Sequence, residues 1–211
     1  MPMKTLIFDF DGTLADSFEL VIDIAYELTG ISKQSDAEVD RLRQLPLLKV
    51  MRQLRIPLRM TPRLLVKGRQ RMHERIREVH PFPGIPEVLK ELHDNGYHLL
   101  VTSSNSEHNV RTFLRTNHLE SYFDGVYGNA SIFNKAVSLK RVMKRNKLDA
   151  ADCFYIGDEV RDVTAAAKVG MEPVAVTWGY QAKEALAEYH PFALVDKPID
   201  LLRVFPSDEV Q

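Results

Sequence analysis

Four short apolar segments separated by helical patterns constrain the fold of this 211-residue chain more than any other feature of its sequence. The segments are residues 4–10, 97–102, 152–157 and 172–178, and they are rich in apolar and β-branched residues. Continuous apolar runs of this length are typical of strands buried on both faces of a sheet. Because helical patterns lie between them, the sequence predicts an α/β fold with a doubly wound parallel sheet.

The helical patterns carry recognisable start and stop signals. Residues 85–95 place apolar side chains at helical spacing and end before Gly96, which suits the position after a helix. Ser106 is a candidate N-cap for the next helix. Further helices are expected over residues 135–145 and over the alanine-rich segment 160–169.

A long helical segment interrupts the alternation after the first strand. We expect residues 17–81 to form a small helical cap, inserted into a discontinuous core of residues 1–16 and 82–211. Within the insertion, Thr61 and Pro62 are interpreted as the N-cap and first residue of a helix. The sequence HPFPGIP closes the insertion, since its three prolines favour a bend over a continued helix.

Charge is distributed unevenly along the chain, although the net charge is only −1. The segment from Arg41 to Arg77 holds ten Arg and two Lys against one acid, Glu74. A basic cap could attract polyanionic substrates, or its arginines could simply cover an outer surface, or it could dock on nucleic acid or another anionic partner. The absence of aromatic residues between the basic ones disfavours stacking on single-stranded nucleic acid.

Other features of composition exclude whole classes of protein. A single cysteine excludes a disulfide framework and a cysteine-rich zinc site, and fits a reducing compartment. No apolar run approaches the roughly 20 residues that a membrane-spanning helix needs. We therefore expect a cytoplasmic protein without a membrane partner.

Two carboxylates follow the first predicted strand in the sequence DFDGT. Asp9 ends the strand, where a carboxylate can act as a covalent nucleophile, and Asp11 is close enough to protonate a leaving oxygen. Gly12 permits a sharp turn, and the hydroxyl of Thr13 can hold the loop by a hydrogen bond. A simple Asp-Gly turn is the structural alternative.

Hydroxyl, amide and ammonium groups follow later in the chain. Thr102 ends the second strand and is followed by Ser103 and Asn105, whose polar groups ahead of a helix suit a phosphate, although they are also ordinary N-caps. Lys135 begins a helix, where its charge opposes the helix dipole. Two explanations for a lysine at a helix start stay open: its side chain is exposed to solvent, or an anionic site lies in front of it.

A further group of acids follows the predicted strand at residues 152–157, in the sequence YIGDEVRD. Asp158, Glu159 and Asp162 lie at this strand end, where acids can cap the following helix or bind a cation. Mg²⁺ takes oxygen ligands and needs only one or two carboxylates together with a substrate phosphate. Ligands bind at the carboxyl ends of strands in an open α/β sheet, so Asp158 beside Asp9 would form such a site.

The order of these groups resembles the four motifs of the haloacid dehalogenase superfamily. DFDGT is similar to its first motif, Thr102 to its second, Lys135 to its third and GDEVRD to its fourth. The resemblance covers nearly the whole chain and is closest to the branch of phosphoglycolate phosphatase and β-phosphoglucomutase, whose helical cap the insertion also resembles. It implies a Rossmann-like core with a C1-type cap.

The resemblance also implies roles for individual residues. Asp9 would attack phosphorus and form an aspartyl phosphate, while Asp11 would protonate the leaving alcohol and then activate water. Mg²⁺ would be held by Asp9, Asp158 and the backbone carbonyl of Asp11. Thr102 and Lys135 would bind the transferring phosphoryl group. From their positions at the strand ends, Gly12, Thr13, Ser103 and Asn105 are further candidates for binding the substrate. Glu159 and Asp162 would lie outside the metal ligands, with Asp162 orienting the lysine or the metal's water.

Asp11 separates the branches of this superfamily, because the dehalogenases have no leaving alcohol to protonate and lack this acid. The sequence therefore predicts a Mg²⁺-dependent phosphatase acting on a small-molecule phosphate monoester. Two alternatives stay open at this point. One is a phosphomutase acting on a sugar phosphate, and the other is an anion- or nucleic-acid-binding protein that uses the basic cap. Neither the substrate nor the oligomeric state follows from the sequence.

Overall fold

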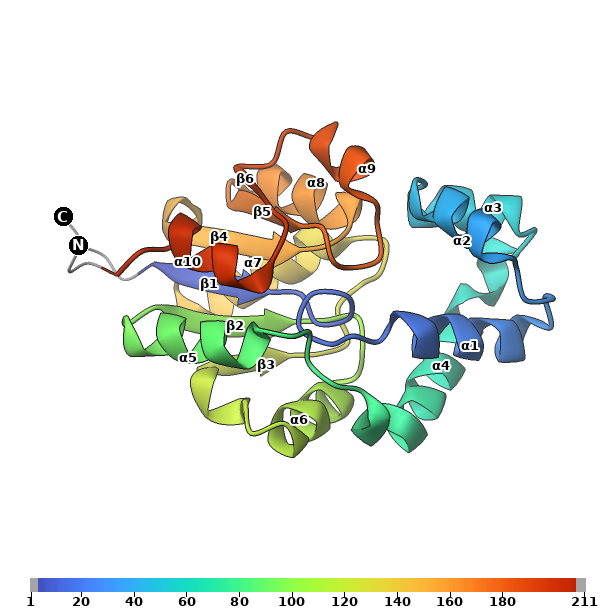
Figure 1. Ribbon diagram of the computed structural model, residues 1–211, viewed down its shortest axis with the longest axis horizontal. Coiled ribbons are helices and arrows are strands. Elements are labelled where there is room, and N and C mark those ends of the chain that lie inside the picture. The colour runs from blue at the N-terminus through green and yellow to red at the C-terminus, as the bar shows by residue number, and fades with distance from the viewer. Residues whose placement is uncertain (1–3, 208–211) are drawn as a thin grey trace.

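A single parallel sheet forms the centre of the protein, as the sequence predicts. The computed structural model describes residues 4–207 (Figure 1). Six strands lie in the order β3-β2-β1-β4-β5-β6, and each neighbouring pair is parallel. The strands are β1 (Thr5–Phe8), β2 (His98–Thr102), β3 (Gly125–Tyr127), β4 (Cys153–Gly157), β5 (Glu172–Val176) and β6 (Ala193–Val195).

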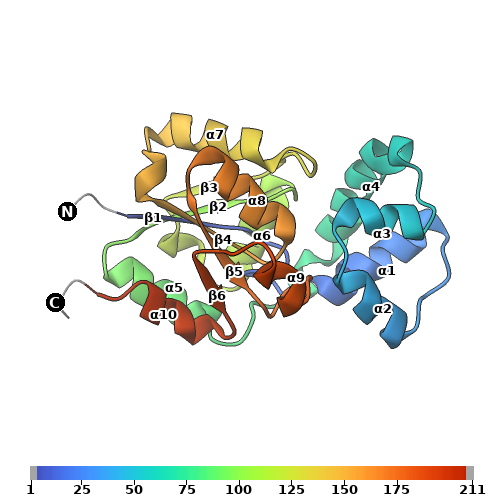
Figure 2. The ribbon, with the colours of Figure 1, turned by 90° about the horizontal axis from the view of Figure 1, so that it is seen from above.

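Helices cover both faces of this sheet, which makes it doubly wound (Figure 2). One face packs against α5 (Ile85–Asp94), α6 (Glu107–Thr116) and α10 (Leu201–Val204). The other packs against α7 (Lys135–Asn146) and α8 (Val160–Val169), with the short α9 (Lys183–Ala187) packed against α8. Within residues 4–207, no helix combines the length and the apolar character needed to cross a bilayer.

The central strand shows why the apolar runs are continuous. Leu6 and Phe8 of β1 pack on the side of α5 and α6, whereas Ile7 packs on the side of α7 and α8. All three side chains are fully buried. A strand that is buried on both faces needs apolar residues at every position, so β1 loses the alternation of a half-exposed strand.

Two strands and one helix start differ from the sequence prediction. The edge strands β3 and β6 are three residues long each and were not predicted, because so short a run carries no periodicity. Ser106 is confirmed as an N-cap, since its Oγ accepts a hydrogen bond from the backbone N–H of Asn109 at 3.1 Å. The prediction of Thr61 as an N-cap is wrong, because a 3₁₀ turn over Leu58–Met60 leads directly into α4 and leaves Thr61 as its first residue.

The inserted segment contains four helices and lies beyond the carboxyl ends of the strands (Figure 1). They are α1 (Phe18–Thr29), α2 (Asp36–Arg43), α3 (Leu47–Gln53) and α4 (Thr61–Arg75). The two connections to the core run side by side, since the backbone N–H of Asp16 donates to His80 O at 2.9 Å and that of Phe82 donates to Leu14 O at 3.1 Å. We call α1–α4 the cap helices, and a division into domains at residues 16 and 82 stays a prediction.

Candidate active site

The predicted site residues gather where the order of strands reverses. The chain proceeds from β1 to β2 and β3 on one side, and then returns to place β4 on the other side of β1. Ligands of doubly wound sheets bind at such a switch point, outside the carboxyl ends of the strands. Asp9 follows β1 and Asp158 follows β4, so the two carboxylates come from adjacent strands.

The loop after β1 is shaped by contacts with Asp158. Thr13 Oγ1 donates a hydrogen bond to Asp158 Oδ1 at 2.8 Å. Gly12 has a φ of +82°, and a Cβ atom at this position would lie 2.2 Å from Asp158 Oδ2. Only glycine fits so close an approach with a left-handed backbone. Gly12 and Thr13 therefore fix the loop that carries Asp11 against the second strand end.

Lys135 is buried between two of the predicted acids. Its ammonium donates to Asp9 Oδ2 at 2.6 Å and also to Asp162 Oδ1. The side chain of Lys135 is only 3% exposed, which excludes the solvated alternative. Asp162 in turn accepts the backbone N–H of Glu159 at 3.0 Å, so it caps α8 and holds the lysine at once. An anionic site in front of Lys135 explains its place at the start of α7.

For both Asp9 and Lys135, burial and the charge of neighbouring groups shift the pKa in opposite directions. Burial raises the pKa of Asp9 to about 6, and the nearby Lys135 ammonium only partly offsets that rise. Burial disfavours the charge on Lys135, but the carboxylates of Asp162 and Asp9 outweigh it and raise the pKa of the lysine. At neutral pH the pair is therefore ionic, and the nucleophile predicted from the sequence carries its negative charge.

The carboxylates at the switch point fit a divalent cation. Ligand oxygens of Asp9, Asp158 and Asp162 lie within 4.8 Å of one another, and all three residues are buried. Asp158 has no ion-pair partner among residues 4–207, and burial followed by the charge of Glu159 raises its pKa well above the usual value. With all three carboxylates ionised, they and the Lys135 ammonium carry a net charge of −2, which a hard divalent ion with oxygen ligands would neutralise.

The raised pKa values predict how stability depends on pH before a metal is bound. Because the pKa of Asp9 rises from an ordinary 3.8 to about 6 on folding, the folded protein loses stability as pH rises through this window. In chelator-treated protein we expect roughly 1 kcal/mol less stability at pH 7 than at pH 5, or a Tm about 2–4 °C lower by differential scanning fluorimetry. Asp9→Asn should remove much of this difference. A Tm that rises from pH 5 to pH 7 in the metal-free wild type would contradict the argument.

Asp11 lines a cleft beneath the cap helices and is less buried than Asp9 and Asp158. Its Oδ1 accepts a hydrogen bond from Ser17 Oγ at 2.9 Å, and its Oδ2 accepts from Asn105 Nδ2 at 3.3 Å. The hydroxyl of Tyr180 lies 2.8 Å from Ser17 Oγ. Burial raises the pKa of Asp11, and the bonds from Ser17 and Asn105 oppose that rise. A half-buried acid with a raised pKa, facing a cleft, suits proton transfer.

The residues after β2 have different local partners. Thr102 Oγ1 is buried and has no hydrogen-bond partner in the described part of the chain, so this hydroxyl stays available to a ligand. Ser103 Oγ accepts the backbone N–H of Asn105 at 2.9 Å and shapes the turn before α6. The side-chain amide of Asn105 donates the hydrogen bond to Asp11 that is described above. A role in binding phosphate stays a prediction for all three.

Three residues of the site were not singled out from the sequence. Ser17 and Tyr180 orient Asp11, and the backbone N–H of Tyr180 also donates to Asp158 Oδ2 at 2.7 Å. Arg161 pairs with Glu159 and donates to Ile132 O at 3.2 Å. The sequence TWGY directly after β5 was a usable signal, because polar residues there face the same edge of the sheet.

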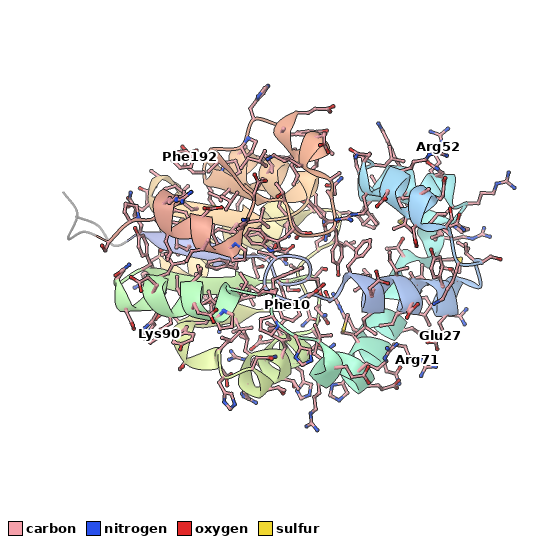
Figure 3. The ribbon with its side chains drawn as sticks, viewed as in Figure 1. Phe10, Glu27, Arg52, Arg71, Lys90 and Phe192 are labelled. Carbon is pink, nitrogen blue, oxygen red and sulfur yellow. The ribbon has the colours of Figure 1, made fainter. Side chains whose placement is uncertain are left out.

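The arginines of the cap helices fall into two groups. Eight of the ten between residues 41 and 77 are exposed, and Arg52 and Arg71 project from the outer surface of the cap helices (Figure 3). The two that are half-buried contact the core. Arg43 donates to the backbone oxygens of Gly179 at 2.7 Å and Tyr180 at 3.0 Å, and Arg69 donates to that of Ser104 at 2.9 and 2.6 Å. Exposure of these eight arginines is compatible both with a simple outer surface and with a surface that attracts anions, so both interpretations stay predictions.

Comparisons with known proteins agree with this geometry. Residues 6–176 match the model of the haloacid dehalogenase-like hydrolase family. The chain is 33% identical over 204 residues to a phosphoglycolate phosphatase of Synechococcus elongatus, covering 95% of this chain and 96% of that protein. It is 31% identical to a probable phosphatase of Dickeya dadantii, covering 92% and 90% of the two chains.

Solved structures resemble the fold of the whole chain. A haloacid dehalogenase-like hydrolase from Streptococcus pneumoniae aligns with a TM-score of 0.80 at 23% identity, covering 96% of this chain and 98% of that one. A putative phosphoglycolate phosphatase from Lactobacillus plantarum aligns with a TM-score of 0.80 at 18% identity, covering 97% and 100%. At these identities the likeness establishes a shared fold. Because the alignments cover 96% and 97% of this chain, the aligned part includes the inserted cap helices.

Proposed function

Because the chain belongs to the haloacid dehalogenase-like hydrolases and is a phosphatase, we propose that it hydrolyses a small phosphate monoester with Mg²⁺ and through an aspartyl phosphate on Asp9. The observation that carries this proposal is the buried cluster at the switch point, in which Lys135 contacts Asp9 and leaves Asp158 without a cation. The names of the relatives make 2-phosphoglycolate the first ester to test.

The first step is attack of Asp9 on phosphorus. Lys135 is bonded to Oδ2, while Oδ1 of Asp9 accepts no hydrogen bond from residues 4–207 and is the oxygen left for the attack. As the bond from Oδ1 to phosphorus forms, the ester bond between phosphorus and the alcohol oxygen breaks. The lysine keeps the nucleophile ionised and attracts the phosphoryl oxygens, which is the electrostatic stabilisation that phosphoryl transfer needs.

Asp11 transfers the protons of both steps. In its protonated form it gives a proton to the departing alcohol, and its carboxylate then takes one from the water that attacks the aspartyl phosphate. Phosphate leaves, and the carboxylate of Asp9 is regenerated. Ser17 and Asn105 each hold one oxygen of Asp11, so its orientation is fixed before the substrate arrives.

The metal would be held by the side chains of Asp9 and Asp158 and by the backbone carbonyl of Asp11. When bound, Mg²⁺ supplies positive charge that stabilises the phosphoryl oxygens in the transition state. Asp158 is prepared for this role by its hydrogen bonds from Thr13 and from the backbone of Tyr180, which fix both of its oxygens. Such support of a ligand by its neighbours is typical of metal sites.

An assay of phosphate release tests this proposal. Purified protein should release inorganic phosphate from 2-phosphoglycolate or p-nitrophenyl phosphate, should lose this activity in EDTA, and should regain it when Mg²⁺ is restored. Acid quenching during turnover followed by borohydride reduction should convert Asp9 to homoserine, which mass spectrometry locates. Failure to release phosphate from a broad panel of monoesters with Mg²⁺ present would refute the assignment. Turnover without modification of Asp9 would refute the aspartyl phosphate.

A further inference from the structure

Two adjoining cavities lie between the cap helices and the core, and the larger one extends from the active site. The larger cavity has a volume of about 320 Å³ and is lined at its base by Asp11, Asn105 and Tyr180. The smaller one has a volume of about 230 Å³ and shares lining residues of α1 and α3 with it. An alcohol group attached to a phosphate on Asp9 would therefore extend into this space past Asp11.

The walls of the larger cavity are apolar. The residues that helix α1 contributes lie three, four and seven positions after Val21, which places them on one side of the helix. Helix α4 packs directly against α1, and both helices line the cavity together with residues of α3. The wall residues of α1 are Val21, Ile24, Ala25 and Leu28. Those of α3 and α4 are Leu47, Met51, Leu64, Leu65, Gly68 and Met72.

Few charged groups line the larger cavity, and among its cations Arg69 has no carboxylate partner within residues 4–207. Arg43 and Arg69 donate to backbone oxygens of the core, and Arg161 pairs with the carboxylate of Glu159. A carboxylate on the substrate could pair with Arg69, but the apolar residues of α1, α3 and α4 offer it no cation, and burying an unpaired charge against them is strongly unfavourable. Glu159 lines both cavities, and its charge is balanced by Arg161, so this pair offers no free cation to a second carboxylate.

Resting on the proposed phosphatase reaction, we propose that the preferred substrate is a phosphate monoester of an uncharged, apolar alcohol whose aromatic ring or alkyl chain occupies the larger cavity. An apolar cavity of roughly 150 Å³ accommodates benzene, so a volume of about 320 Å³ admits a substituted ring or a medium-length chain. Along α1, the eight residues from Val21 to Leu28 give the wall a length of roughly 10 Å. The two-carbon glycolate group would fill only a small part of this volume.

A series of alkyl phosphates tests the proposal without changing the chemistry of the leaving group. Ethyl phosphate and hexyl phosphate differ in apolar length, and 6-phosphonooxyhexanoate matches the hexyl chain but ends in a carboxylate. We expect kcat/KM for hexyl phosphate to exceed that for ethyl phosphate by about 10- to 100-fold, since each buried methylene contributes several-fold. It should also exceed the values for 6-phosphonooxyhexanoate and for 2-phosphoglycolate by at least about 10-fold.

Two neighbouring residues of α4 provide a matched pair of variants. Leu65 is half-buried and lines the larger cavity, whereas Val66 is 66% exposed and does not. Leu65→Asp should lower the ratio of kcat/KM for hexyl over ethyl phosphate by about 10-fold or more, and Val66→Asp should leave this ratio unchanged. The ratio is insensitive to partial unfolding, because a smaller folded fraction lowers both values equally.

The outcomes separate this proposal from the proposed function. Hydrolysis of 2-phosphoglycolate or 6-phosphonooxyhexanoate in preference to hexyl phosphate would overturn the apolar alcohol and leave the phosphatase reaction intact. An unchanged ratio of kcat/KM for hexyl over ethyl phosphate in Leu65→Asp would also overturn the apolar alcohol and leave the phosphatase reaction intact. Failure to hydrolyse any of the four esters with Mg²⁺ present would overturn both.

Discussion

Asp9→Asn should reduce the rate of phosphate release by at least about 10³-fold, because the amide cannot attack phosphorus or carry the covalent intermediate. The substitution keeps the size of the side chain, and its backbone N–H still donates to Ile156 O, which extends the β1–β4 ladder at 2.8 Å. Lys135 retains its contact with Asp162. Loss of activity would therefore report on the nucleophile rather than on the fold, and circular dichroism at neutral pH should match the wild type.

The matched control for this variant is Asp16→Asn. Asp16 is exposed and lies in the same loop as Asp9, and its backbone, not its carboxylate, pairs with His80. It should keep phosphate release within about twofold of the wild type, as expected for a surface substitution away from the site. Wild-type turnover in folded Asp9→Asn, with deamidation excluded by mass spectrometry, would contradict the proposed mechanism.

The carboxylates of the site could be predicted because they depend on one simple feature of the fold. Asp9 and Asp158 each come directly after a buried apolar run, and parallel strands carry their carboxyl ends to one edge. Lys135 was predicted for a related reason, since a cation at a helix start opposes the dipole and needs an anionic partner. The structure provides that partner at 2.6 Å in Asp9.

The orienting residues could not be predicted in the same way. Ser17 meets Asp11 only because the loop after β1 folds back through Gly12, and Tyr180 reaches Ser17 from a loop 163 residues further along the chain. Such contacts depend on the path of loops, which hydrophobic periodicity does not specify. The same holds for Arg43 and Arg69, since nothing in the charge pattern separates these two from the eight exposed arginines of the segment.

The strand count failed for a different physical reason. The edge strands β3 and β6 have three residues each, and only one residue of each is fully buried. An edge strand is covered less completely than a central one, so its sequence need not be uniformly apolar. The central strands that place the site were predicted, and the missed edge strands lie away from it in the sheet order.

Lys135→Met should have the largest effect on stability of any single substitution in the site. It removes the ammonium that contacts both Asp9 and Asp162 and leaves two buried carboxylates without it. Breaking a buried ion pair by removing one partner typically costs about 3–5 kcal/mol, so we expect a Tm about 10 °C lower at pH 7 in metal-free protein. The deficit should shrink towards pH 5, because protonation of Asp9, whose pKa burial raises even beside the lysine, removes one of the stranded charges.

A second substitution separates the structural role of Lys135 from its chemical one. Asp162→Asn in the Lys135→Met background removes one uncompensated charge, so it should recover a measurable part of the lost Tm. Phosphate release should stay at least about 10²-fold below the wild type in the double variant, because no ammonium is left to stabilise Asp9 and the phosphoryl oxygens. If activity returned together with the Tm, Lys135 would be a structural cation only, and the charge that stabilises phosphoryl transfer would have to come from elsewhere in the site.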